Sequence, residues 1–203
     1  MTVVGITGGL ASGKSEVARF FKRRGAVIFD ADEAARKQVQ KGKPVYRAIL
    51  KIFGRKFLRA DGQIDRKKLA GHVFTHPKDL KKLNILIHPG VIFDCIRMIK
   101  EADRQKKFLV MDVPLLFESR MQGLADVTLV ISSNREKMLS RAAKKGIARP
   151  LAQKILLTQW PLARKERLAD FVIQNNGTLK ELEKEVNNVI RQINQGDKTN
   201  NGY

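Results

Sequence analysis

The chain has 203 residues, enough for one substantial hydrophobic core and a small inserted lobe. Apolar residues make up 43% of the sequence and charged residues 30%, and no apolar run approaches the roughly 20 residues of a membrane-spanning helix. We therefore expect no membrane insertion. Forty Lys and Arg against twenty Asp and Glu give a formal net charge of +20, which favours anionic ligands.

A single cysteine, Cys95, excludes an internal disulfide. Its apolar neighbours predict a packed side chain rather than a nucleophile. The first residues read directly as a strand and lack the basic and apolar segments of a secretory signal. We expect a cytoplasmic protein.

Five short apolar runs predict the strands of one sheet. They are rich in Val, Ile and Phe and are separated by helical patterns, which is typical of a parallel sheet with helices on both faces. The expected fold class is α/β, a three-layer sandwich around a five-stranded parallel sheet. The runs span residues 2–7, 26–30, 108–113, 126–132 and 170–174.

The segment between the second and third strands is too long for a single crossover helix. Apolar stripes before and after His88–Pro89 predict two helices that are separated at this pair. An inserted helical lobe is the expected result.

Further along the chain, residues 135–149 form a basic helical stretch that includes Arg141. The last helix is predicted to begin at a capping box made by Thr178 and Glu181. Beyond Gly196 the small polar tail is expected to fray.

Residues 8–15 read GGLASGKS and match the phosphate-loop pattern G-x-x-x-x-G-K-[ST] between a predicted strand and a predicted helix. Glycines let backbone N–H groups turn toward phosphates at the positive end of the helix. Lys14 is expected to reach the β- and γ-phosphates and the Ser15 hydroxyl to ligate Mg²⁺. The predicted ligands are therefore ATP and Mg²⁺. We expect ATP contacts from Gly8, Gly9, Leu10, Ala11, Ser12, Gly13, Lys14, Ser15 and Glu16.

The rest of the chain narrows the class of phosphate-loop protein. The guanine-reading Asn-Lys-x-Asp motif of GTPases is absent, and a compact chain with a helical insertion and an Arg-rich helix suits small-molecule kinases. A kinase needs a carboxylate that accepts the proton of the acceptor hydroxyl. Asp30 and Asp32 follow the second strand, at the strand end where ligands bind in α/β sheets. Continued extended backbone would put both on one side, whereas Asp32 could instead cap the next helix.

Two other functions are compatible with these motifs. One is a kinase for a nucleoside or nucleoside monophosphate. Such kinases also have a phosphate loop, an inserted lobe and a lid that closes over the reacting phosphates. The other is a nucleic-acid-binding ATPase, suggested by the charge of +20. Because two Tyr and one Trp offer few stacking platforms, we do not expect nucleic acid as the primary partner.

The chain contains, in this order, the segments GITGGLASGKS, FDAD, DGQIDRKKL, His88–Pro89, DVPLLFE, the Arg141 region and ADFVIQNNG. In this order along nearly the whole chain, the segments closely resemble the motifs of the dephospho-coenzyme A kinases. The loop departs from the family pattern at Leu10–Ala11, where Ile-Gly is commoner, and Ala11 narrows the backbone freedom there. Phe29 stands where Val or Ile is expected.

The resemblance implies an enzyme that uses ATP to phosphorylate the ribose 3′-hydroxyl of dephospho-coenzyme A, its small-molecule substrate, in the last step of coenzyme A synthesis. It implies a nucleotide-binding core of residues 1–30, 105–134 and 165–203, an acceptor-binding insertion of residues 31–104 and a lid of residues 135–164.

The same resemblance implies roles for individual residues. Asp32 is the expected general base, Lys14 and Ser15 contact the ATP phosphates and Mg²⁺, and Arg141 is the lid charge that stabilises the transferring group. His88 and Leu115 are expected in the acceptor pocket, with Asn175 and Gly177 near adenine. Structural roles stay open for several of them: Arg141 as a solvated helix charge, His88 as a cap or packed residue, and Asn175 and Gly177 as a turn into the last helix.

Overall fold

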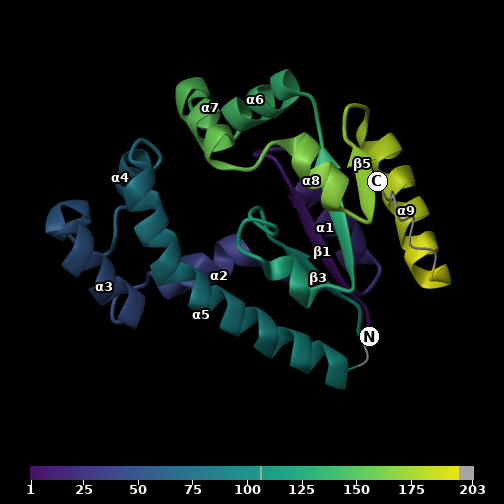
Figure 1. Ribbon diagram of the computed structural model, residues 1–203, viewed down its shortest axis with the longest axis horizontal. Helices are drawn as coiled ribbons and strands as arrows, with labels where there is room; N and C mark the ends of the chain where they lie inside the picture. The colour runs from purple at the N-terminus through teal and green to yellow at the C-terminus, as the bar shows by residue number, and fades with distance from the viewer. Residues whose placement is uncertain (106, 197–203) are drawn as a thin grey trace. The chain divides into compact units, whose positions relative to one another are not determined.

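The computed structural model describes residues 1–105 and 107–196 (Figure 1). Two compact units are present, one made of Met1–Phe29 together with the chain from Met98 on, the other of Asp30–Arg97. The tail at 197–203, for which the sequence predicts fraying, lies outside the described residues.

The first unit is built on the predicted five-stranded parallel sheet, with strand order β2-β3-β1-β4-β5. β1 and β4 are buried along their whole length, which explains why the apolar runs show no polar alternation. All five predicted strands are confirmed. They are β1 (Val3–Gly8), β2 (Val27–Asp30), β3 (Leu109–Asp112), β4 (Val127–Ser132) and β5 (Phe171–Gln174).

Helices cover both faces of this sheet. Apolar side chains of α1 (Lys14–Arg23) and α9 (Leu179–Gln195) share one cluster with β1, β4 and β5. A second apolar cluster is formed by Phe117, Val130 of β4 and Ala169. α8 (Leu162–Leu168) contacts β4 beside it. The capping box of α9 is present as predicted, since Glu181 N–H donates to Thr178 Oγ1 and Thr178 N–H donates to Glu181 Oε2.

Two further helices of the first unit, α6 (Arg135–Lys144) and α7 (Arg149–Thr158), form an adjacent pair (Figure 1). Their apolar contact is made by Leu139, Ala142 and Ala152, and Leu10 and Ala11 of the phosphate loop pack against the same cluster. The helix pair is therefore in direct contact with the loop.

The second unit is helical around its own core, to which Tyr46, Ile49, Phe53 and Leu69 contribute. Cys95 is fully buried, as predicted, and burial raises the pKa of its thiol to about 12. The helices are α2 (Ala31–Gln38), α3 (Pro44–Phe53), α4 (Arg66–Val73) and α5 (Pro77–Arg104), with 3₁₀ turns η1 (Arg55–Phe57) here and η2 (Met121–Leu124) in the first unit.

The predicted break at His88–Pro89 is wrong, because α5 runs through Pro89 without ending. Proline removes one hydrogen bond, to the carbonyl of Ile85, at a cost of about 3 kcal/mol. Both Pro89 and Ile85 are exposed, so the proline lies on the outer face of the helix, and the apolar stripes on either side keep the helix packed. No helix in residues 1–105 and 107–196 is long and apolar enough to span a bilayer.

Candidate active site

The phosphate loop leaves the carboxyl end of β1 and leads into α1, and two of its glycines are required by close approaches. A Cβ on Gly8 would lie 2.2 Å from the carbonyl oxygen of Ile131, and one on Gly13 would lie 2.1 Å from the side-chain nitrogen of Asn175. Gly13 also has φ 110° as the N-cap of α1. Only glycine allows the loop to curl this tightly at the helix N-terminus, where anions bind.

Two side chains from distant parts of the chain hold the loop. Asn175, which is buried after β5, donates from Nδ2 to the Ser12 carbonyl at 2.7 Å. Arg141 of α6 donates to the same carbonyl at 3.3 Å and to the Asn175 carbonyl at 3.1 Å. Arg141 is therefore not a solvated helix charge: it joins α6, the loop and the end of β5.

The loop has features that fit a bound phosphate chain. Ser12 Oγ is fully buried and accepts or donates no hydrogen bond among the described residues. Lys14 Nζ lies 3.1 Å from the Gly9 carbonyl oxygen, so its ammonium group stays at the loop. A buried hydroxyl without a partner costs free energy, which an anionic ligand at the loop would offset.

Ala11 adopts the left-handed conformation with φ 55°, which glycine accepts freely and alanine does not. For a residue with a Cβ this conformation costs roughly 1–2 kcal/mol. Its methyl group packs with the α6–α7 cluster, as does Leu10. Compared with Ile-Gly, the Leu10–Ala11 pair therefore has a backbone conformation of higher energy at Ala11, and in return it gains an apolar contact with α6 and α7.

A cavity of about 580 Å³ in the first unit brings together many of the residues predicted to bind ATP. Three basic side chains, Arg19, Lys144 and Lys145, also line it, together with Leu179 and Leu182 of α9. Sequence reasoning did not assign these five to the site, although the basic run around Arg141 had pointed to part of them. The predicted residues in its lining are Ala11, Gly13, Ser15, Glu16, Arg141, Asn175 and Gly177.

A buried ion pair, which sequence reasoning missed, fixes the DVPLLFE segment. Lys165 of α8 is fully buried, and its Nζ lies 2.7 Å from Glu118 Oε1 and 2.9 Å from the Pro114 carbonyl oxygen. Thr7 Oγ1 donates to the same carbonyl, and Trp160 N–H donates to Glu118 Oε1. Burial lowers the pKa of Lys165, while Glu118 acts in the opposite direction. The pair joins the segment after β3 to the chain that follows α7.

The FDAD segment differs from its predicted geometry. α2 begins at Ala31, so Asp32 lies in its first turn rather than on extended backbone. The N-cap is Asp30, whose Oδ1 accepts from Glu33 N–H at 2.9 Å. The alternative role of Asp32 as the cap is therefore wrong, and its side chain is not used to begin the helix.

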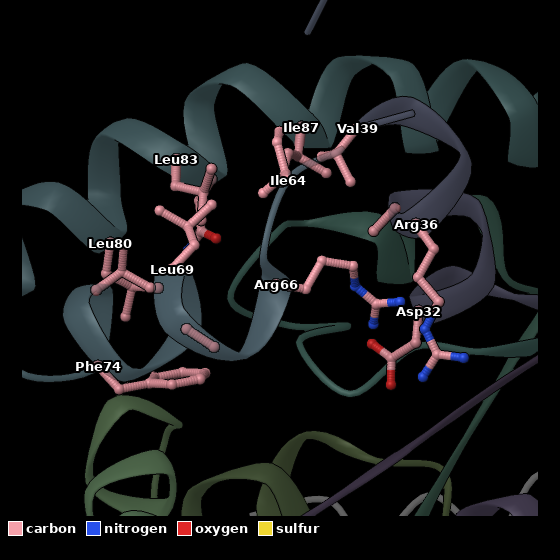
Figure 2. Close-up of a pocket in the computed structure, with 14 residues that line it drawn as sticks. Asp32, Arg36, Val39, Ile64, Arg66, Leu69, Phe74, Leu80, Leu83 and Ile87 are labelled. Carbon is pink, nitrogen blue, oxygen red and sulfur yellow. The ribbon is translucent and has the colours of Figure 1, made fainter. Parts of the chain in front are cut away.

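Asp32 lines a second cavity, of about 360 Å³, which lies within the second unit (Figure 2). Arg36 of α2 and Arg66 of α4 line it as well, while apolar side chains of α4 and α5 form much of the remainder. Partial burial lowers the pKa of Arg66, and the positive charge of Arg36 lowers it further.

The two residues predicted for the acceptor pocket lie elsewhere than in this lining. His88 of α5 is half-buried, and this burial lowers its pKa. It does not line the cavity, where α5 contributes Leu80, Leu83, Asn84 and Ile87. Leu115 belongs to the first unit, where its carbonyl accepts from Ser119 Oγ at 2.7 Å.

Comparisons with known proteins agree on one family. A family model described as dephospho-CoA kinase matches residues 2–181. A dephospho-CoA kinase of Fusobacterium nucleatum is 41% identical over 196 residues, covering 94% of this chain and 98% of the relative. One of Geobacillus kaustophilus is 39% identical over 191 residues, covering 93% and 95%. The solved structure of a dephospho-CoA kinase from Campylobacter jejuni, 26% identical, matches with a TM-score of 0.70 over 96% of this chain and 98% of that one.

Proposed function

The chain belongs to the dephospho-CoA kinase family, and on that premise we propose how its residues transfer the γ-phosphoryl group of ATP to the ribose 3′-hydroxyl of dephospho-CoA. The observation that carries the proposal is the nucleotide cavity, where the loop, Arg141 and Asn175 meet around a glycine-lined turn. This arrangement supports binding of the ATP phosphates at the N-terminus of α1.

In the transfer, the acceptor oxygen forms a bond to the γ-phosphorus as the bond to the β–γ bridging oxygen breaks. ADP leaves with that electron pair, and the Asp32 carboxylate takes the proton of the acceptor hydroxyl. Lys14 and Arg141 stabilise the charge that spreads over the transferring oxygens. Because little covalent chemistry falls to the protein, these residues act through position and charge.

Ser15 is the residue that would hold Mg²⁺, because it lines the nucleotide cavity in the first turn of α1 and carries a hydroxyl oxygen. When bound, the ion neutralises charge on the β- and γ-phosphate oxygens. We assign residues 31–104 to the acceptor and residues 135–164 to the lid. We place the reaction in the cytoplasm, in agreement with a chain whose one cysteine forms no internal disulfide.

A coupled assay of ADP release tests the proposal. Dephospho-CoA with ATP and Mg²⁺ is expected to release ADP, and the product is expected to carry one additional phosphate on the ribose. AMP and adenosine as acceptors, and RNA or DNA as activators, should give little release. Equal rates with AMP would indicate a nucleotide kinase instead, and no release above background with dephospho-CoA would overturn the assignment.

A further inference from the structure

The cavity of the second unit has a charged end and an apolar remainder. Figure 2 shows the guanidinium group of Arg66 extended toward Asp32, with that of Arg36 close by, while Leu69 and Leu80 lie away from them. The charged side chains therefore gather at one place in the lining.

The charged side chains of this cavity come from defined positions on two helices. Asp32 and Arg36 are four residues apart on α2, so they project from the same helix face. Arg66 is the first residue of α4, and the cap of that helix, Asp65 Oδ1, accepts from Lys68 N–H at 3.0 Å. The two arginines thus come from separate helices and converge on one carboxylate.

The balance of charge at this end is positive. Two guanidinium groups and one carboxylate line the cavity, and the charge of Arg59 also acts on Arg66. Gathering like charges beside an apolar wall costs free energy, which an anionic ligand would offset. The structure therefore favours an anion beside Asp32.

Arginine is suited to one kind of anion in particular. Its planar guanidinium donates two parallel hydrogen bonds to phosphate oxygens, and it stays charged when partly buried. Two arginines from different helices match a ligand with two linked phosphates. A hydrophobic remainder, lined by Leu69, Leu83 and Ile87, suits an uncharged chain that continues from those phosphates.

We propose that Arg36 and Arg66 form the subsite for the diphosphate of the acceptor, beside the general base. The inference rests on the proposed function, because dephospho-CoA carries a diphosphate between its adenosine and its pantetheine arm. Binding the 5′-diphosphate here sets the position of the attached ribose, whose 3′-hydroxyl is the reacting group. Arg36 and Arg66 are then specificity-determining residues, which select acceptors that have the diphosphate.

The test compares Arg66→Gln and Arg36→Gln with the unchanged chain in the ADP-release assay and in calorimetric titrations with dephospho-CoA. Each substitution is expected to raise both the KM and the Kd for dephospho-CoA by about 10 to 100-fold. The kcat and the KM for ATP should change less than about threefold, since neither arginine is assigned to the nucleotide. Arg66→Lys keeps the positive charge but loses the pair of parallel hydrogen-bond donors. Its KM for dephospho-CoA should lie between those of the unchanged chain and Arg66→Gln.

The chain offers a matched control in Arg59→Gln. Arg59 is exposed and acts on Arg66 through its charge, but it does not line the cavity. This variant should leave the KM for dephospho-CoA within about threefold of the unchanged value. An equal rise of the KM for dephospho-CoA in Arg59→Gln and Arg66→Gln would overturn the proposal. It would show that the overall positive electrostatic field, and not a subsite, attracts the acceptor.

Ligand fragments separate a phosphate contact from damage to the fold. In the unchanged chain 4′-phosphopantetheine should inhibit more strongly than pantetheine, and Arg66→Gln should remove that difference without weakening pantetheine. A fall in kcat at constant KM would overturn the subsite and assign the arginines to the carboxylate of Asp32, whereas an unchanged kcat together with an unchanged KM would remove them from the site. A chain that binds dephospho-CoA without turnover would contradict the proposed function, while the calorimetric loss in Arg66→Gln would still support the subsite.

Discussion

The two cavities differ in the kinds of groups that line them. At the phosphate loop, Arg141 and Asn175 are each hydrogen-bonded to backbone carbonyls, which joins the loop to α6 and to the end of β5. In the second unit, Asp32, Arg36 and Arg66 line an open cavity with a largely apolar remainder. The first cavity, which we propose as the nucleotide half of the site, is thus built around hydrogen-bonded backbone, whereas the second, the proposed acceptor half, combines charged side chains with an apolar lining. Substitutions can test this contrast.

The largest effect is expected at the acceptor half, from Asp32→Asn. Replacing the carboxylate by an amide removes the group that takes the proton, so kcat should fall by about 100 to 10,000-fold. ATP binding, measured by calorimetry, should stay nearly unchanged, because the nucleotide cavity lies within the first unit. Near-normal turnover would remove Asp32 from the role of base.

The second-largest effect is expected in the unit that holds the nucleotide cavity, where Lys165→Met should lower stability. The substitution leaves the Glu118 charge buried without its cation, which typically costs about 3–5 kcal/mol in the free energy of unfolding. Denaturant unfolding would measure the loss. The exposed pair Lys37–Glu33 provides the control, since Lys37→Met should cost less than about 1 kcal/mol. Similar losses in the two variants would show that the buried pair is not a special support of this unit.

A smaller effect is expected within the loop, from Gly13→Ala. The new Cβ would meet the Asn175 side chain and would also strain a backbone with φ 110°, for a combined loss of about 2–4 kcal/mol. ATP affinity should fall with it. In Gly146→Ala the backbone is strained at φ 76° but nothing lies within 4 Å, so only about 1–2 kcal/mol should be lost. Equal losses would mean that Asn175 yields freely and that the loop is not rigid.

Local patterns in the sequence predicted much of the fold. The phosphate loop, the five strands and the Thr178 capping box each depend on neighbouring residues, and all three are present. The continuity of α5 through Pro89 was missed, because packing on both sides outweighs one lost hydrogen bond. The N-cap of α2 is Asp30 and not Asp32, the cap that the sequence offered as an alternative, because the helix begins at Ala31.

The contacts that escaped prediction join residues that are distant in the sequence. Asn175 and Ser12 are 163 positions apart, and Pro114 and Lys165 are 51 apart. No local pattern marks such pairs. A lysine in a charged helix reads as a surface residue until the fold shows that Lys165 is fully buried.

The Lys165–Glu118 pair also limits how the chain can evolve. A substitution at either position alone leaves the other charge buried, so single-step routes away from the pair pass through a destabilised protein. Both positions could change in one lineage only together, or after other substitutions had added stability to spare. Among descendants of this sequence, residues 118 and 165 are therefore expected to be inherited as a unit, even though we assign neither a role in the phosphoryl transfer.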